Sequence, residues 1–142
     1  MVNIIVFTIV FLDQLAKFLA LRLISQGQSI EIIRHVLYFS IVKNTGAAFG
    51  IFKNGTIFFL IISITAVICV LLILKKVKGA DTLLKCALAM ILGGALGNLI
   101  DRLRFACVID FIDFRVWPVF NIADACISIG AALLILRIMR SK

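Results

Sequence analysis

The chain has 142 residues, of which 63 % are apolar, and its mean hydropathy is +1.20. Soluble domains contain about 45 to 50 % apolar residues, so this composition excludes an ordinary soluble protein and indicates an integral membrane protein. The net charge is +8, but the basic residues interrupt apolar runs instead of forming a stripe, which argues against nucleic acid as a partner. A spanning helix needs about 20 residues, so we expect four spans in a single domain, 1–142.

The first apolar stretch, about 2–23, predicts a spanning helix that carries two charges. Asp13 and Lys17 are four residues apart, so they lie on one helix face with the acid N-terminal to the base, which is the favourable order. At a rise of about 1.5 Å per residue, Asp13 lies beyond the middle of the bilayer. The two charges either only neutralise each other or line a site, because intramembrane charges commonly mark functional cavities.

Residues 24–55 form the longest segment between spans. The run 36–42, VLYFSIV, is rich in β-branched and aromatic residues and predicts a short strand. A turn is expected at 44–46, in which Asn44 is a turn-forming residue, and a second short strand is expected at 47–52. His35 is the only histidine, and we interpret it as a surface residue.

The second apolar stretch, 56–74, contains no charged residue and predicts a scaffold helix. Four spans place the following loop and both termini on the same side of the membrane. Basic clusters favour the cytoplasm, so we expect both termini there and the longer loops on the opposite side. The basic residues concerned are Lys75, Lys76, Lys78, Lys85, Arg137, Arg140 and Lys142.

The third span is expected at about 83–100. Gly93 and Gly97 have the GxxxG spacing, which lets helix backbones approach closely. Asn98 and Arg102 are four residues apart at the end of this stretch and therefore share a face. An arginine that ends a spanning helix either extends to the membrane interface or holds a carboxylate, and the sequence leaves both roles open.

The loop 103–118 contains Asp110 and Asp113 and is expected to be partly extended, with Trp117 as an interfacial anchor. The fourth span, about 120–139, carries Asn121, Asp124 and Ser128 on one face. Asp124 lies about one turn inside this span. At about 1.5 Å per residue, the three carboxylates of Asp13, Asp110 and Asp124 can occupy one layer near the outer side of the bilayer.

Our hypothesis is that Asp110 and Asp124 form an intramembrane acid pair. Two carboxyl groups in one site do not both ionise easily, so the pair holds a single proton near neutral pH. The ionised member can take a proton from water while the protonated member polarises a carbonyl group, which gives peptide hydrolysis without a covalent intermediate. The sequence contains no HExxH, GxSxG or phosphate-binding motif that would indicate other hydrolytic chemistry.

Two other functions are compatible with buried acids. Carboxylates in helical bundles also build proton or cation pathways, although the four spans show no inverted repeat. A non-enzymatic assembly subunit, which packs through its GxxxG motif, is a third candidate. We expect neither a disulfide nor a metal site, because three cysteines fall within predicted spans and only Cys107 lies in a loop.

Five segments together resemble the lipoprotein signal peptidase family, also called signal peptidase II. They are Asp13 with Lys17, KNTGAAFG at 43–50, GALGNLIDR at 94–102, VIDFIDF at 108–114 and FNIADACISIG at 120–130. The resemblance covers essentially the whole chain. It implies an all-α membrane protein, a four-helix transmembrane bundle with a small periplasmic β-cradle and a short periplasmic helix. It also implies an aspartic endopeptidase of the bacterial inner membrane.

This resemblance further implies the substrate and the site. The substrate would be a diacylglyceryl-modified prolipoprotein, cut before its lipidated cysteine by a catalytic pair that falls on Asp110 and Asp124. Supporting residues would be Asp13, Lys17, Asn44, Asn98, Arg102 and Asn121. Asp113 is a second acid nearby, but Asp110 aligns with the family's first aspartate. The resemblance implies no cofactor, contact with membrane lipid and inhibition by globomycin-type cyclic peptides, and we expect a monomer.

Overall fold

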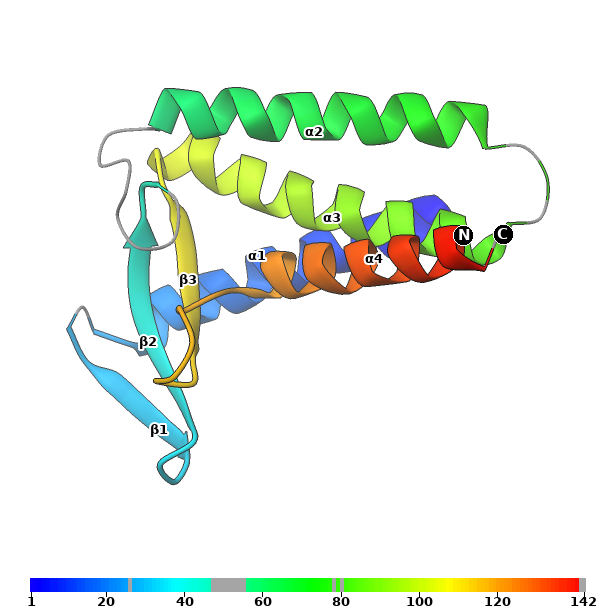
Figure 1. Ribbon diagram of the computed structural model, residues 1–142. Coiled ribbons are helices and arrows are strands. Elements are labelled where there is room, and N and C mark those ends of the chain that lie inside the picture. The colour runs from blue at the N-terminus through cyan, green and yellow to red at the C-terminus, as the bar shows by residue number, and fades with distance from the viewer. Residues whose placement is uncertain (26, 47–55, 78, 80, 141–142) are drawn as a thin grey trace.

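The computed structural model describes residues 1–25, 27–46, 56–77, 79 and 81–140. Four helices within these ranges are long and apolar enough to cross a membrane, and they lie roughly alongside one another (Figure 1). Each of the four predicted spans thus corresponds to one of these helices. The helices are α1 (Val2–Leu23), α2 (Thr56–Lys76), α3 (Thr82–Phe105) and α4 (Ile122–Met139).

The first residues of α3 and α4 follow from capping side chains. Asp81 begins α3, because its side chain accepts a hydrogen bond from the backbone N–H of Leu84 at 3.0 Å. Asn121 begins α4 through a capping box with Asp124. The fourth helix therefore begins two residues later than the predicted 120. At its other end, α3 continues five residues beyond the predicted 100.

Helix α3 is the centre of the bundle and contacts each of the other three helices. Small residues allow this close packing. A Cβ atom added at Gly93 would lie 3.0 Å from Ile9 of α1, and one at Gly97 would lie 2.7 Å from Asp13 Oδ2. At Gly130 of α4, an added Cβ would lie 2.8 Å from the carbonyl oxygen of Ala87. The GxxxG motif thus packs against α1.

A three-stranded antiparallel sheet lies across one end of the helices, and the two chain termini lie at the other end (Figure 1). Its strands are β1 (Ser29–Ile33), β2 (Leu37–Asn44) and β3 (Val108–Asp113), in the order β1-β2-β3. The predicted strand at 36–42 corresponds to β2, and the partly extended loop contains β3. The sequence reasoning did not predict β1.

Two further expectations concern the same region. Asn44 ends β2, where it pairs with Val108. Its Oδ1 also accepts a hydrogen bond from the backbone N–H of Gly46 at 3.1 Å, as in the expected turn. The expected strand at 47–52 lies outside the described residues. Within the described residues no helix occurs besides the four named above, so the short periplasmic helix is not among them.

Candidate active site

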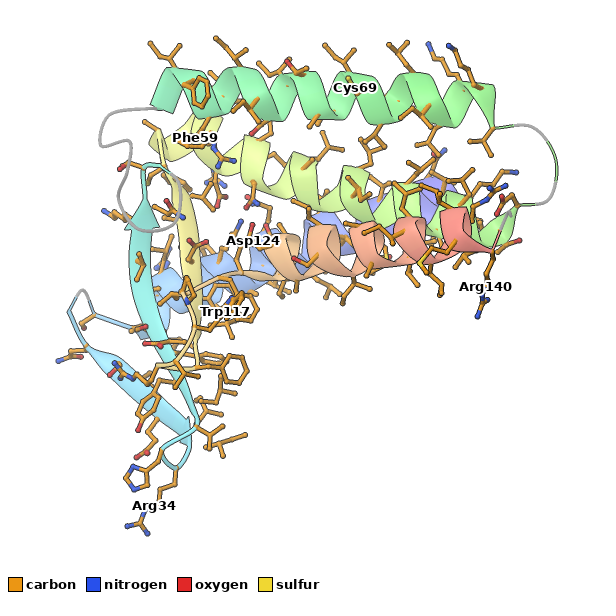
Figure 2. The ribbon with its side chains drawn as sticks, in the orientation of Figure 1. Arg34, Phe59, Cys69, Trp117, Asp124 and Arg140 are labelled. Carbon is orange, nitrogen blue, oxygen red and sulfur yellow. The ribbon has the colours of Figure 1, made fainter. Side chains whose placement is uncertain are left out.

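The two proposed catalytic carboxylates come from β3 and from the first turn of α4. Asp110 pairs with Val42 in the centre of the β2–β3 ladder, and its side chain is 1 % exposed. Asp124 is the third residue of α4, at the end of that helix nearer the sheet (Figure 2). Both acids therefore lie in one region, at the end of the bundle that carries the sheet.

Asparagine side chains connect the two acids. Asn121 Nδ2 donates to Asp110 Oδ1 at 2.6 Å and also lies 3.2 Å from Asn98 Oδ1. Asn98 Nδ2 donates to Asp124 Oδ1 at 2.7 Å. Because Asn121 caps α4 and is fully buried, the cap that begins the helix also fixes the side chain that holds Asp110.

A third asparagine completes the hydrogen bonding of Asp110. Asn44 Nδ2 donates to Asp110 Oδ2 at 3.0 Å, and Asn44 Oδ1 accepts from the backbone N–H of Gly46 at 3.1 Å. Both carboxyl oxygens of Asp110 therefore receive an amide N–H. This position at the end of β2 explains why an asparagine stands there.

Asp13 and Lys17 belong to a larger buried cluster. Lys17 Nζ lies 2.7 Å from Asp13 Oδ2, 2.8 Å from Asp101 Oδ2 and 3.2 Å from Asn98 Oδ1. Asp13 Oδ1 accepts from the backbone N–H of Ala123 at 2.9 Å. The cluster thus joins α1 to α3 and to the first turn of α4, directly beside the acid pair.

Sequence reasoning missed Asp101 as a member of this site. Its other contacts are to Gln14 Nε2, at 2.8 Å, and to the backbone N–H of Ile109 at 3.0 Å, one residue before Asp110. The available signal was spacing, because Asp101 follows Asn98 by three residues and so lies on a neighbouring part of the same helix face.

Arg102 approaches the site from another side of α3. Its Nη1 lies 3.2 Å from Ser63 Oγ of α2 and 3.5 Å from the carbonyl oxygen of Asn98, and its guanidinium stands 5.9 Å from the ring centre of Phe59. None of the salt bridges found among the described residues involves Arg102. Direct pairing with a carboxylate is therefore not its role in this structure.

Asp113 is clearly separated from the pair. Its carboxylate accepts from Ser40 Oγ at 2.9 Å and from the backbone N–H of Arg115 at 2.7 Å, and it forms a salt bridge with the same arginine. These partners stabilise the β2–β3 end of the sheet. Of the two neighbouring acids, only Asp110 is joined to Asp124 through the asparagines.

Electrostatics distinguish Asp110 from an ordinary aspartate. Burial and the nearby charge of Asp124 together raise the pKa of Asp110 to about 7, whereas the hydrogen bonds from Asn44 and Asn121 oppose the change. An acid with this pKa is about half protonated near neutral pH. The site can therefore offer a carboxylic acid and a carboxylate at the same time.

Several known proteins are similar to this chain over nearly its whole length. The family model described as "Signal peptidase (SPase) II" matches residues 5–140. A lipoprotein signal peptidase of Halothermothrix orenii is 42 % identical over 100 % of this chain and 97 % of its own length. One from Caldanaerobacter subterraneus is 46 % identical over 94 % of this chain and 92 % of its own.

A solved structure also matches over nearly the whole chain. A bacterial membrane enzyme determined by the in meso method has a TM-score of 0.92 and 34 % sequence identity, covering 98 % of this chain and 87 % of its own. Together with the family model and the two relatives, this structure shows that the similarity covers nearly the whole chain, in sequence and in fold. The chain belongs to the signal peptidase II family and is a multi-pass membrane peptidase.

Proposed function

We propose that this protein is an aspartic endopeptidase that removes signal peptides from diacylglyceryl-modified prolipoproteins by cleaving before the lipidated cysteine, with Asp110 and Asp124 as its catalytic pair. The observation that carries the proposal is the asparagine bridge between two largely buried carboxyl groups at one end of a spanning bundle. A lipid-modified substrate keeps its acyl chains and its signal helix in the bilayer. The scissile bond must therefore be cut at membrane depth.

The reaction needs one proton on the pair. The carboxylate takes a proton from a water molecule, whose oxygen attacks the carbonyl carbon of the scissile bond, while the carboxylic acid donates its proton to the carbonyl oxygen. The tetrahedral intermediate then collapses and the C–N bond breaks. The acid that took the proton from water gives it to the leaving amine, and the other acid takes a proton from a hydroxyl group of the intermediate, so the pair again holds one proton. Because two interacting acids titrate as a unit, the starting proton belongs to the pair and is not assigned to either residue.

The supporting residues act on the pair and not on the substrate bond. Asn44, Asn98 and Asn121 direct their N–H groups at the carboxyl oxygens and so orient them. Asp13 and Lys17 hold α1 against the first turn of α4. Arg102 places a positive charge near both acids without pairing with either, and this charge favours the ionised member of the pair.

We further propose an orientation in the bacterial inner membrane, with both termini in the cytoplasm and the site near the periplasmic face. Basic residues gather at the end of the bundle away from the sheet, as expected for a cytoplasmic side. They are Lys75, Lys76, Lys85 and Arg137. Membrane lipid and the lipidated precursor are the expected partners of a monomer that needs no cofactor and binds no nucleic acid. Globomycin-type cyclic peptides should occupy the acid pair.

The test is cleavage of a purified diacylglyceryl-modified precursor by the protein in lipid, with and without globomycin. Asp110→Asn and Asp124→Asn should each abolish the product, and Asp113→Asn, the matched control, should retain substantial cleavage. Full activity of either of the first two variants would remove that residue from the pair. Ion flux into liposomes without any peptide product would instead favour the proton- or cation-conducting alternative.

A further inference from the structure

Helix α2 carries a buried hydroxyl group on the face that packs against α3. Ser63 is 9 % exposed, whereas Thr65, two residues further along, is exposed. Ser63 Oγ donates to the carbonyl oxygen of Phe59 at 2.8 Å and accepts from Arg102 Nη1 at 3.2 Å. Because a hydroxyl group has a single proton, the bond within α2 leaves its lone pairs for the guanidinium.

Phe59 completes the contact of α2 with this arginine. It precedes Ser63 by four residues, so both side chains lie on the same face of the helix. The centre of its ring lies 5.9 Å from the guanidinium carbon of Arg102, within the range of a cation–π interaction. Phe59 lies at the end of α2 nearer the sheet (Figure 2). Helix α2 therefore meets Arg102 with a hydrogen-bond acceptor and an aromatic ring.

These contacts keep the Arg102 guanidinium inside the bundle. An arginine near the end of a spanning helix usually extends to the membrane interface, and α3 ends only three residues later, at Phe105. Arg102 Nη1 instead lies 3.5 Å from the carbonyl oxygen of Asn98, about one turn back along α3. Ser63 lies seven residues after the start of α2, which is roughly 10 Å at about 1.5 Å per residue.

This depth brings the charge of Arg102 to the acid pair. Asn98, whose carbonyl oxygen accepts from Arg102, also donates through Nδ2 to Asp124 Oδ1 at 2.7 Å. The charge of Arg102 acts on both Asp124 and Asp110. A nearby positive charge favours the ionised carboxylate, which must take a proton from water. Moving the guanidinium to the interface would weaken this effect, because Coulomb energy falls with distance.

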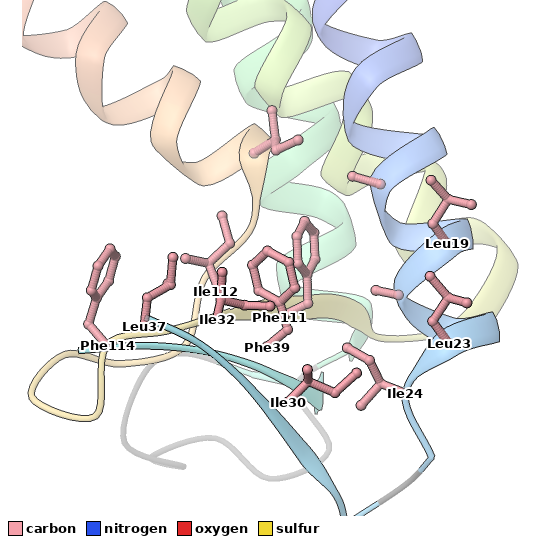
Figure 3. A pocket seen from close by; sticks show the side chains of 13 residues that line it. Leu19, Leu23, Ile24, Ile30, Ile32, Leu37, Phe39, Phe111, Ile112 and Phe114 are labelled. Atoms are coloured by element: carbon pink, nitrogen blue, oxygen red, sulfur yellow. The ribbon is translucent and has the colours of Figure 1, made fainter. Parts of the chain in front are cut away.

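The opposite face of β3 supplies no such charge. Successive side chains of a strand point to opposite faces, and Phe111, next to Asp110, lines a groove of about 670 Å³ between the sheet, α1 and the start of α4 (Figure 3). Among the described residues, the 13 side chains that line this groove are all apolar, and none comes from α2 or α3. The positive charge near the pair therefore comes from Lys17 in its buried cluster and from Arg102 beside α2.

We propose that Ser63 and Phe59 are positioning residues of the peptidase, because they hold the Arg102 guanidinium at the depth of Asp110 and Asp124. Both act through Arg102 and not on the substrate bond. Helix α2, predicted to be a scaffold, thus takes part in the site. The inference rests on the proposed function, because it assigns a role within the reaction of the acid pair.

The test measures cleavage of a diacylglyceryl-modified precursor by the protein in lipid nanodiscs. Ser63→Ala removes the hydrogen-bond acceptor, Phe59→Leu removes the ring, and the double variant removes both. Ser63→Thr and Phe59→Tyr are conservative replacements that keep the hydroxyl group and the ring. Thr65→Ala, which removes an exposed hydroxyl group from the same helix, is the matched control. The wild type and Asp110→Asn test the proposed function itself in the same assay.

We expect the double variant to turn over about ten- to a hundredfold more slowly than the wild type, with a similar Michaelis constant. Ser63→Ala and Phe59→Leu alone should each show part of this loss. The two conservative replacements and Thr65→Ala should stay within about twofold of the wild type. A loss of turnover without a loss of binding is expected because the substitutions move a charge that acts on the reacting acids.

The pH profile of turnover separates this role from a merely structural one. When the guanidinium is no longer held, the ionised carboxylate is less favoured, so the profile should move to higher pH by about half a unit. A loss of packing alone would lower turnover without moving the profile. The other charged groups beside the pair are the same in every variant; they are Asp13, Lys17 and Asp101.

Three results would overturn the proposal. They are wild-type turnover of the double variant, a loss of turnover without displacement of the pH profile, and an equal loss in Thr65→Ala. Failure of the proposed function looks different, because then the wild type leaves the precursor uncut or Asp110→Asn cleaves it equally fast, and the role of α2 in the reaction falls with it. Gel filtration shows which variants are folded, and the single variants decide the question if the double variant does not fold.

Discussion

Replacing Asp110 with asparagine should abolish peptidase activity. The variant should nevertheless become more stable than the wild type as the pH rises. In the folded chain the pKa of the Asp110 carboxyl group, titrating beside Asp124, is about 7, whereas an ordinary aspartate has a value of 3.8. Because the folded-state pKa is the higher one, folding is progressively penalised as the pH rises from 3.8 through about 7. At about 1.4 kcal/mol per pH unit, the full penalty is about 4 kcal/mol.

The asparagine variant removes this titration but also disturbs a hydrogen bond. Asn44 and Asn121 both donate to Asp110, and an asparagine offers only one oxygen in place of two, which costs about 1 kcal/mol. The variant is therefore expected to be about as stable as the wild type at about pH 5 and more stable than the wild type at about pH 8. The difference between their free energies of unfolding should grow by about 2.5 kcal/mol over this pH range.

The assay is reversible unfolding by SDS titration in detergent micelles at several pH values. Ile41→Val, a neighbouring change in β2 that involves no titratable group, is the control, and its stability difference from wild type should not vary with pH. If the difference between Asp110→Asn and wild type also stays constant over this range, the acid pair does not bind a proton more tightly in the folded than in the unfolded chain, and the reasoning fails.

Three other predictions follow from the buried network and the helix packing. Lys17→Met leaves the carboxylates of Asp13 and Asp101 without their shared cation and should lower the free energy of unfolding by about 3 to 5 kcal/mol, measured by the same SDS titration; the exposed Lys43→Met should change it little. Gly130→Ala forces a methyl group against the carbonyl of Ala87 and should cost about 1 to 3 kcal/mol, whereas a loss no larger than that of Ser128→Ala would show that α3 and α4 can separate freely. Asn121 orients Asp110, so Asn121→Ala should lower the turnover rate of cleavage far more than it weakens binding of the precursor. An effect confined to the Michaelis constant would contradict that role.

The sequence predicts the spans well because the signal is local. About 20 apolar residues form each span, and α2 contains no charge before its last turn. The sheet is different, because β2 and β3 pair across a separation of more than 60 residues in the chain. Strand β1 escapes prediction because Glu31 and Ser29 interrupt its apolar pattern, and their partners on β2 and after β3 become apparent only in three dimensions.

In the site too, local sequence predicts some residues, whereas only the fold identifies others. Asp13, Asp110 and Asp124 stand out in the sequence because acids near membrane-spanning segments are costly. Asp101 does not stand out, because it lies at the polar end of the third span beside Arg102, and only the fold brings it to Lys17. Asn44 is likewise a typical turn residue by local rules, and only the pairing of β2 with β3 brings it to Asp110.

The central claim is that Asp110 and Asp124 act as one catalytic unit. A double-mutant cycle on the cleavage of a diacylglyceryl-modified precursor, in the same lipid throughout, tests it most directly. The account predicts that Asp110→Asn, Asp124→Asn and the double variant all have the same residual rate, because removal of either acid already disables the pair. Independent, multiplicative losses, or substantial cleavage by the double variant, would contradict a shared role.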